Sequence, residues 1–269
     1  MSDYCDNAHR PIYKYIRFKY IQKMLKNRTI FVSKITKWED VYENFFLKQK
    51  FCTECGMEIS QELLSDCFPG IFGQSWTLQK SSDAMWRIYS QIAEGSDLDD
   101  TAVRIETTPQ KLLTQIGQYN SEGTLGLLLK AVEYKSSEEI DEWLTKIQPI
   151  TKNNMADLII KSLFIKRLDF QHEKEVRLIA HKKNDDKSSR HDYFESVIDP
   201  FFMISEYVVD PRVDDVKYEQ MKNLLVQLGV EAQRIRKSQL YKLNKRTLVV
   251  DAKEYNKERP HGGIFPLWN

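Results

Sequence analysis

The stretch Glu173-Lys174-Glu175-Val176-Arg177-Leu178-Ile179-Ala180 combines an acidic pair with a β-strand pattern. From Glu175 onward, charged and apolar residues alternate, which is typical of a half-buried strand. Side chains two residues apart on a strand face the same side, so we expect Glu173 and Glu175 to share one face. Two carboxylates at a strand entrance can stabilise a developing cation and orient or deprotonate an acceptor. A solvated charged turn, whose ion pairs contribute little, is the competing interpretation.

Elements of both kinds surround this strand. Further strands are predicted at residues 11–15, 29–33, 71–77, 102–105, 124–134, 193–198, 204–209, 230–235 and 247–250. Helices are predicted at 17–25, 137–147, 154–168 and 211–228, and after residues 34, 83 and 108. Strands and helices do not alternate regularly. The pattern therefore predicts an α+β fold, with one mixed or antiparallel sheet and flanking helices, rather than a doubly wound sheet.

The composition limits the function classes. The 269-residue chain has 40 Lys and Arg, 39 Asp and Glu and a formal net charge of +1. This balance argues against a polyanion-binding protein with a basic field over its whole surface, and leaves a local basic groove open. We expect a single domain over residues 1–269. No apolar stretch approaches the roughly 18–20 residues of a spanning helix, and no signal-peptide order is present, so we expect a cytoplasmic protein without a membrane segment.

Residues 48–70 form a candidate insertion that contains three of the four cysteines. Cys52-Thr53-Glu54-Cys55-Gly56 has the spacing of a zinc knuckle, and Cys67 follows twelve residues later. A structural zinc needs four ligands, and the fourth would have to come from Cys5 or His9. We therefore favour free cysteines that pack as small apolar residues, and predict no metal.

Common nucleotide-binding motifs are absent. The chain has no P-loop, no Gly-x-Gly-x-x-Gly and no legible Ser/His/Asp set, which argues against kinases, P-loop ATPases and Rossmann dehydrogenases. Tyr13, Lys14 and Tyr15 on the first strand, with Ser33 on the second, could instead hold a flat ring and a phosphate. The simpler alternative is that the two tyrosines pack one face of the strand.

Several short boxes follow one another along the chain: Tyr13-Lys14-Tyr15, Ile30-Phe31-Val32-Ser33, Trp38-Glu39-Asp40-x-x-Glu43, Ser75-Trp76-Thr77, Ala84-Met85-Trp86-x-x-Tyr89, Val103-x-Ile105-x-Thr107 and Glu173-Lys174-Glu175-Val176-Arg177. Their order resembles an uncharacterised bacterial family that occurs in defence and toxin-like settings. The resemblance runs from residue 12 to residue 243. The Met-Trp-x-x-Tyr and Glu-x-Glu-x-Arg boxes are its most specific parts, whereas the third box lacks the proline of the family pattern.

The same order also resembles the ADP-ribosyltransferase fold. That fold opens with a strand, a helix and a second strand, matched here by residues 13–15, 17–25 and 30–33, and places a glutamate at the start of a late strand, matched by Glu175. In transferases with Glu-x-Glu spacing, the second glutamate is catalytic and the first handles the acceptor. The chain departs from the family in two places. Its first strand lacks the usual Arg or His, and the Ser-Thr-Ser form is reduced to Val32-Ser33-Lys34.

The resemblance implies an NAD-dependent mono-ADP-ribosyltransferase toxin of bacterial phage defence. Glu175 would stabilise the ribose cation and Glu173 would position or deprotonate the acceptor. The residues expected to bind NAD are Tyr13, Lys14, Tyr15, Ser33, Trp38 and Arg104. The target would be RNA, DNA or a protein, and a toxin of this kind implies an antitoxin protein. A non-catalytic binding or sensor module of a defence system and a hydrolase of NAD or nucleic acid remain alternatives.

Overall fold

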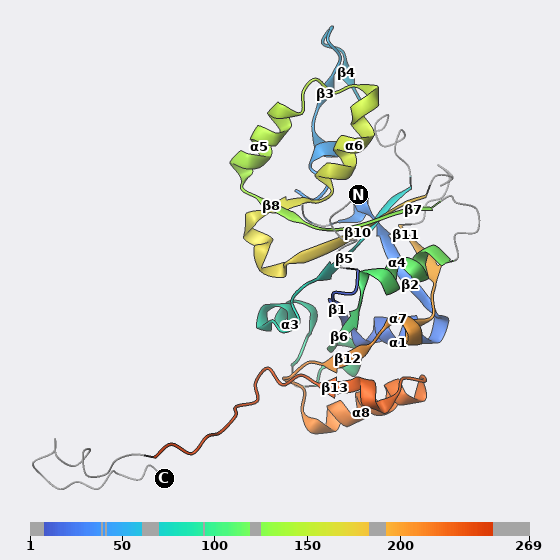
Figure 1. Ribbon diagram of the computed structural model, residues 1–269, viewed down its shortest axis with the longest axis vertical. Helices are drawn as coiled ribbons and strands as arrows, with labels where there is room; N and C mark the ends of the chain where they lie inside the picture. Colours follow the sequence, from blue (N-terminus) through green and yellow to red (C-terminus); the bar gives the residue numbers. More distant parts are fainter. Residues whose placement is uncertain are drawn as a thin grey trace, which may run out of the picture.

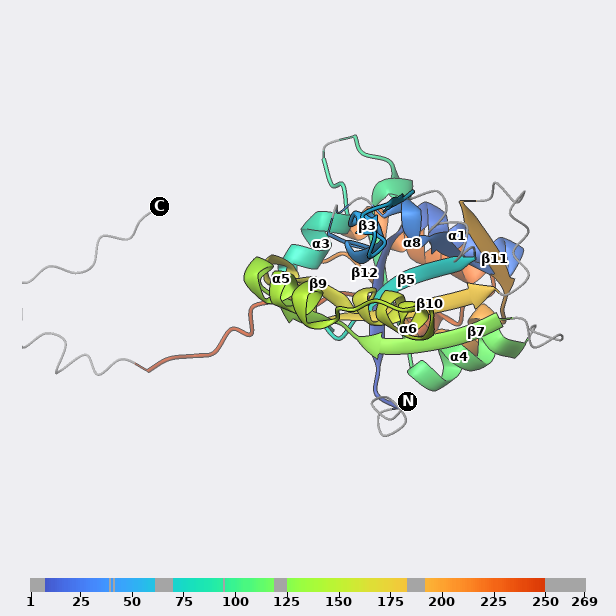
Figure 2. The ribbon, with the colours of Figure 1, turned by 90° about the horizontal axis from the view of Figure 1, so that it is seen from above.

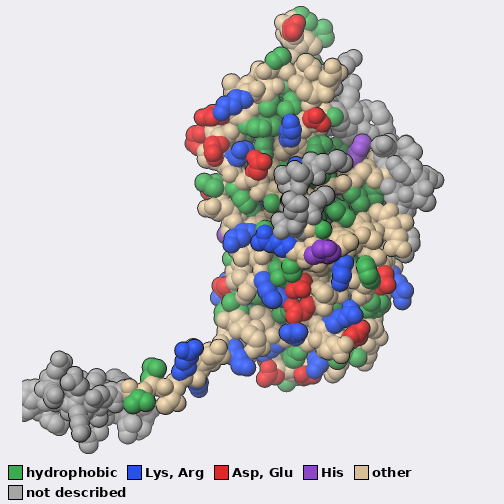
Figure 3. Space-filling view, viewed as in Figure 1, with side chains coloured by type: hydrophobic (Ala, Val, Ile, Leu, Met, Phe, Trp, Pro, Cys, Tyr) green, Lys and Arg blue, Asp and Glu red, His purple; other side chains and the backbone are tan. Residues whose placement is uncertain are grey.

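The computed structural model describes residues 8–38, 40, 42–60, 70–93, 95–118, 125–182 and 192–249. These residues form a mixed α+β structure in which helices flank a mainly antiparallel sheet (Figure 1). The predicted α+β class is therefore confirmed. Acidic and basic side chains are interspersed over the face shown in Figure 3, in keeping with the net charge of +1.

The main sheet contains nine strands among the described residues. Its order is β11-β2-β5-β1-β6-β12-β13, and β10 pairs with both β5 and the edge strand β7. All of these pairs are antiparallel except β12 with β13. Its strands are β1 (Ile12–Arg17), β2 (Thr29–Lys34), β5 (Ile71–Thr77), β6 (Ala102–Thr107), β7 (Leu125–Ala131), β10 (Glu175–Lys182), β11 (Tyr193–Val197), β12 (Glu206–Val209) and β13 (Ile235–Lys237). Two small sheets pair β3 (Phe51–Cys52) with β4 (Glu58–Ile59) and β8 (Glu133–Lys135) with β9 (Ile165–Arg167).

Helices cover both faces of the sheet. Leu178 and Ile179 are neighbours on β10 that point to opposite faces, and each belongs to a different hydrophobic core. The helices are α1 (Phe18–Asn27), α3 (Asp83–Tyr89), α4 (Pro109–Gln118), α5 (Ser137–Lys146), α6 (Lys152–Ser162), α7 (Pro200–Met203) and α8 (Asp215–Gln227). The core that contains Leu178 also includes side chains from α1, α4, α7 and α8. The core that contains Ile179 includes side chains from α5 and α6. Helix α6 lies over β10 in Figure 2. None of the described helices is long and apolar enough to cross a membrane.

Strand β5 changes its neighbour along one edge, and this change opens the sheet. Near its start, Phe72 and Gly73 pair with β2, whereas its last residue, Thr77, pairs with Tyr13 of β1. Its other edge pairs with β10 over the whole length of the strand. Between the two partners, Gln74-Ser75-Trp76 face a gap in the described ladder. Side chains or water must therefore replace the missing ladder bonds.

Helix α1 forms one wall of this gap. Its buried apolar residues recur at helical spacing and are Phe18, Ile21, Met24 and Leu25. The helix ends at Asn27 because Arg28 adopts a left-handed conformation with a φ of 53°. This reversal leads the chain directly into β2, so the predicted strand–helix–strand order is confirmed.

The prediction of one long strand over residues 124–134 is wrong. Strand β7 ends at Ala131 and β8 begins at Glu133, and the two strands belong to different sheets. The chain changes partners at this point, because the amide of Val132 donates to Glu175 whereas that of Glu133 donates to Phe164. A hydrophobic run cannot reveal such a change, since both strands need apolar residues.

Two further local predictions are also wrong. The residues after Lys34 form the 3-10 turn Ile35–Lys37 and further turns, rather than an α-helix. The described residues 247–249 form no strand, and Val250 lies outside the described residues. Leu248 and Val249 are 84% and 94% exposed, because this part of the chain extends away from the body (Figure 1) and meets no neighbouring strand.

Candidate active site

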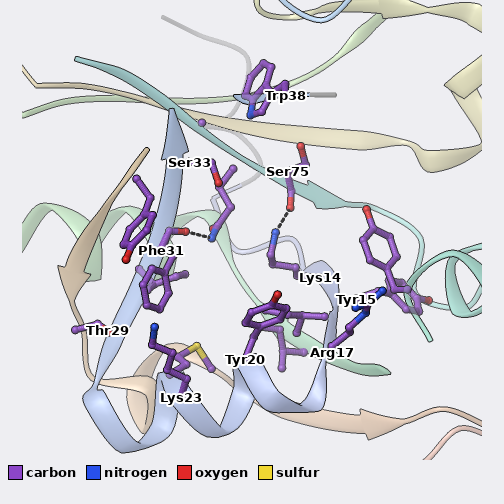
Figure 4. A pocket seen from close by; sticks show the side chains of 18 residues that line it. Lys14, Tyr15, Arg17, Tyr20, Lys23, Thr29, Phe31, Ser33, Trp38 and Ser75 are labelled. Carbon is purple, nitrogen blue, oxygen red and sulfur yellow. Dashed lines mark hydrogen bonds between the residues drawn. The ribbon is translucent and has the colours of Figure 1, made fainter. Parts of the chain in front are cut away.

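The gap beside β5 opens into a cavity of about 660 Å³ (Figure 4). Its walls come from β1, α1, β2 and β5, and Trp38 and Tyr89 also contribute to them. A volume of this size lies within the range of sites that bind small molecules. The cavity follows from the topology, since a continuous ladder between β1 and β5 would occupy the same space.

Lys14 spans the gap beside β5. Its ammonium donates a hydrogen bond of 2.8 Å to the carbonyl of Ser75 (Figure 4). Burial lowers the pKa of the Lys14 ammonium to about 8, against the charge of Glu175, which raises it. Lys14 lines both the large cavity and a smaller pocket that reaches Glu173 and Glu175. It therefore lies between the cavity and the acidic residues.

Glu175, the first residue of β10, has a fully bonded carboxylate. Its side chain is 1% exposed. Arg177 donates to both carboxylate oxygens at 2.7 and 2.9 Å, Lys166 donates at 3.0 Å, and the Ser75 hydroxyl donates at 2.7 Å. Burial raises the pKa of the Glu175 carboxyl, but the charge and hydrogen bonds of Arg177 and its neighbours outweigh burial and lower this pKa to about 2. Glu175 is therefore ionised and held in one orientation at neutral pH.

Arg177 connects this carboxylate to a second acid and to an indole ring. Besides its contacts with Glu175, it donates to Glu43 at 2.7 Å, and its guanidinium lies 4.5 Å from the centre of the Trp38 ring. A Cβ at Gly73 would overlap Cζ2 of Trp38 and lie 2.9 Å from its Cη2. The glycine therefore leaves the space in which Trp38 covers Arg177 and lines the cavity.

Glu173 lies before the strand, at the end of the 3-10 segment Leu168–Glu173. Lys174 follows in a left-handed conformation with a φ of 44°, so the expectation that both glutamates share one strand face is wrong. Lys166 still brings them together, because its ammonium lies 2.7 Å from Glu173 and 3.0 Å from Glu175. The side chain of Glu173 is 20% exposed, so it is the carboxylate of the pair that solvent or a second substrate can reach.

The remaining residues predicted to bind NAD occupy different positions. Ser33 and Trp38 line the cavity. Tyr15 contributes to its wall but is 2% exposed and packs edge-on against Trp86, with ring centres 4.7 Å apart. Tyr13 lines only the smaller pocket. The tyrosine pair thus supports the site from β1, and Tyr15 also fills core.

Arg104 is not among the residues that line the cavity. Its guanidinium stacks over the Tyr13 ring at 4.8 Å and forms an ion pair with Glu206 at 2.6 Å. It also donates to the carbonyl of Lys80. The charge of Arg104 is therefore engaged outside the cavity.

The groups that hold the acids in place were not predicted from the sequence. Ser75 is 100 residues from Glu175 in the chain. The register of β5 against β10 sets Ser75 opposite Arg177, two residues from Glu175, and so brings the serine hydroxyl to the carboxylate. Lys166 and Glu43 were also missed as members of the cluster, although Glu43 lies in one of the boxes. The alternating pattern at Arg177 was the available signal, because a charged residue inside a buried strand needs buried partners.

The structure describes only part of the candidate zinc knuckle of residues 48–70. Cys52 and Cys55 are exposed free thiols on the hairpin of β3 and β4, so the expectation that they pack as apolar residues is wrong. Cys5 and Cys67 lie outside the described residues. Within the described ranges, no group of three or more His, Cys, Asp or Glu side chains is arranged to hold a metal ion.

Comparison with known proteins gives a partial family match and distant structural neighbours. Residues 85–178 match a family described as a protein of unknown function, DUF2971. Thermus sp. 2.9 DarT in complex with NAD+ is similar at 11% identity and a TM-score of 0.36, over 85% of this chain and 95% of that chain. The same DarT in complex with ADP-ribosylated ssDNA is similar at 11% identity and a TM-score of 0.36, over 85% of this chain and 94% of that chain. No curated protein matches the chain.

Proposed function

We propose that this protein is an NAD-dependent mono-ADP-ribosyltransferase that acts as a toxin in bacterial defence against phages. The observation that carries the proposal is the Glu175 carboxylate, ionised and immobilised beside a cavity of about 660 Å³ with aromatic and basic walls. The sequence resemblance to transferases with Glu-x-Glu spacing assigns the catalytic role to the same residue.

The charge of the site suits cleavage of the nicotinamide–ribose bond. This cleavage builds positive charge on the ribose, as in glycoside hydrolysis. The cluster joins three carboxylates to two cations, so one carboxylate charge is left to act on the ribose and on the neighbouring Lys14 ammonium; its members are Glu43, Glu173, Glu175, Lys166 and Arg177. Because the cluster is fixed before the reaction, it stabilises the developing cation without reorganising.

The cavity walls match the chemistry of a dinucleotide. Trp38 and Tyr89 offer aromatic surface to a nicotinamide ring, and Ser33 offers a hydroxyl from β2. Lys23 of α1 brings positive charge to the same cavity, where it suits the pyrophosphate. Arg17, the last residue of β1, also lines the cavity but pairs with Asp100. In this arrangement a residue of α1 contacts the pyrophosphate. Arg104 does not, because it forms an ion pair with Glu206 outside the cavity.

Glu173 suits the acceptor step. Its partial exposure and its contact with Lys166 place a reachable carboxylate next to Glu175, where it would position or deprotonate the acceptor nucleophile. The acceptor is RNA, DNA or a protein. Action in the cytoplasm and an antitoxin protein as partner are parts of the same proposal.

A labelling experiment tests this function. The purified protein is incubated with adenylate-labelled NAD and a bacterial lysate, and the label is partitioned among protein, RNA and DNA. We expect label in one fraction together with released nicotinamide. Glu175→Gln should reduce both by about a hundredfold or more, the size of effect that electrostatic groups have on such transition states. Glu219→Gln, at an exposed position on α8, is the matched control and should leave both unchanged.

Other outcomes of the labelling experiment would contradict the proposal in different ways. If neither nicotinamide release nor transfer of label occurs, the transferase proposal is rejected. Nicotinamide release without transfer would identify an NAD hydrolase instead. Undiminished transfer by Glu175→Gln would remove the catalytic assignment of Glu175 and direct attention to Glu173.

A further inference from the structure

One end of the cavity contains a cluster of aromatic rings around one lysine. Phe31 on β2 and Tyr193 on β11 contact edge to face, with ring centres 5.1 Å apart. Lys23 on α1 lies 4.4 Å from the centre of the Phe31 ring. In Figure 4, the Lys23–Phe31 pair and Tyr15 lie at opposite ends of the cavity. Three separate elements thus converge at this end.

The charge of Lys23 is not neutralised by an acid of the described chain. Arg17 and Lys19 both pair with Asp100 at one end of the same helix. In the described ranges, by contrast, no carboxylate lies within 4.0 Å of the Lys23 ammonium. The side chain is exposed and lines the cavity, so its ammonium offers both charge and hydrogen-bond donors to a ligand there.

Core packing does not account for these rings. Tyr193 lines the cavity but is 45% exposed, and Phe31 lines it while only partly buried. A fully buried position would gain more from such large apolar surfaces. Half-exposed rings beside an unneutralised cation are instead suited to contact a flat base and its phosphate.

We propose that Lys23, Phe31 and Tyr193 bind the adenylate half of the NAD substrate. The rings contact the adenine, and the ammonium of Lys23 contacts the adjacent phosphate. This inference rests on the proposed function and adds the direction of the substrate: the nicotinamide end points toward Lys14 and Ser75, and the adenine end points toward β11.

The opposite end of the cavity is unsuited to the adenylate half. Lys14 already donates to Ser75, and the hydroxyl of Tyr15 donates to backbone carbonyls at 3.3 and 3.4 Å. The bond to be cleaved must also lie beside Glu175. The adenylate half therefore has to extend from there along α1, toward Lys23.

Binding of the two halves of NAD to the full chain tests this inference. Titration calorimetry with AMP and with nicotinamide mononucleotide separates the ends of the cavity. We expect Lys23→Gln and Tyr193→Ala each to weaken AMP about tenfold, the loss of one charge-assisted or stacking contact, and to leave nicotinamide mononucleotide unchanged. Lys26→Gln is the matched control, because Lys26 is exposed on the same helix and does not line the cavity.

Competition with NAD gives the outcomes that overturn the inference. Unchanged AMP affinity in both variants, no AMP binding to the wild type, or AMP that does not compete with NAD would each do so. A single-stranded oligonucleotide that displaces AMP but not nicotinamide mononucleotide would assign this end to the acceptor and also overturn it. Glu175→Gln separates the two proposals, since it should reduce NAD cleavage about a hundredfold or more, while its retained AMP affinity shows that the variant is folded. If the wild type binds AMP through Lys23 yet cleaves no NAD, the transferase proposal fails and the nucleotide site stands.

Discussion

The ammonium of Lys14 lies 2.8 Å from the carbonyl oxygen of Ser75, across the gap between β1 and β5. A charged side chain thus takes the place of a ladder bond that the diverging strands cannot make. Burial lowers the pKa of this lysine to about 8. The interruption of the sheet therefore creates both the cavity and a lysine in its wall that titrates near neutral pH.

Ligand binding and stability should respond to pH in opposite directions through Lys14. Its pKa is about 8 in the folded chain and 10.5 in the reference state, so the unfolded chain binds more protons between these values. Stability from this group therefore increases with pH across that window, by at most about 3 kcal/mol. Affinity for the anionic dinucleotide should decrease across the same window, because the ammonium is lost.

Urea unfolding and NAD binding, measured from roughly pH 7 to 10 on the wild type and on Lys14→Met, check this prediction. The difference between the two proteins isolates the lysine from other titrating groups. If Lys14→Met retains the binding inflection near pH 8, another group is responsible.

Neutralising Glu175 should destabilise the protein strongly. Glu175→Gln removes the fully buried carboxylate that Arg177 and Lys166 both contact, and leaves them only the more exposed Glu43 and Glu173 as counter-charges. Breaking a buried ion pair in this way costs about 3–5 kcal/mol. The folded pKa of about 2 lies below the reference value of 4.5, so the stabilisation is present above pH 4.5 and is lost as the pH falls toward 2. Chemical denaturation of the variant, and of the wild type under acid conditions, measures both effects.

A second substitution shows whether the loss arises from the unpaired charge. Adding Lys166→Met to Glu175→Gln removes one of the two cations that lose the Glu175 carboxylate and should restore part of the lost free energy of unfolding. Glu142→Gln affects an exposed pair with Lys146 and should change stability by less than about 1 kcal/mol. Purely additive losses from the two buried substitutions would contradict the ion-pair explanation.

The parts of the fold encoded within about ten residues could be predicted from sequence, and the contacts between distant strands could not. Strand β10, strand β1 and helix α1 are each indicated by the pattern of apolar residues within their own segment. The position of Glu175 at a strand start was predicted for the same reason. Its hydrogen bond from Ser75 depends on the register of β5 against β10, and the bond from Arg177 to Glu43 joins residues 134 apart. No local pattern specifies such a register.

Gly73→Ala should displace Trp38 from its place over Arg177. The added methyl group would overlap Cζ2 of the indole, so the ring must move or the strand must shift. Overpacking of this kind typically costs about 1–3 kcal/mol. Tryptophan fluorescence and unfolding experiments should report both the altered indole environment and the loss of stability.

Gly126→Ala on β7 is the matched control for this substitution. Its nearest atoms would lie at 3.8 and 4.0 Å, which is ordinary contact, so stability and fluorescence should remain near the wild type. Combining Gly73→Ala with Trp38→Leu should recover part of the stability, because the smaller side chain leaves room for the methyl group. Equal effects of the two glycine substitutions would mean that the indole does not require Gly73.

Two serines in the cavity wall allow the catalytic arrangement to be tested directly. Ser75 donates at 2.7 Å to Glu175, whereas Ser33, the serine predicted from the sequence, lines the same cavity without being one of the donors to that carboxylate. Ser75→Ala should therefore raise the pKa of Glu175, loosen its orientation and lower kcat for nicotinamide release about tenfold, with little change in KM. Ser33→Ala should change kcat less than about twofold and act mainly on KM, as expected for a contact to bound substrate. Steady-state kinetics of the two variants distinguish these roles. If Ser33→Ala loses more kcat than Ser75→Ala, Ser33 is the partner of Glu175 in the reaction, and the hydrogen bond from Ser75 has only a structural role.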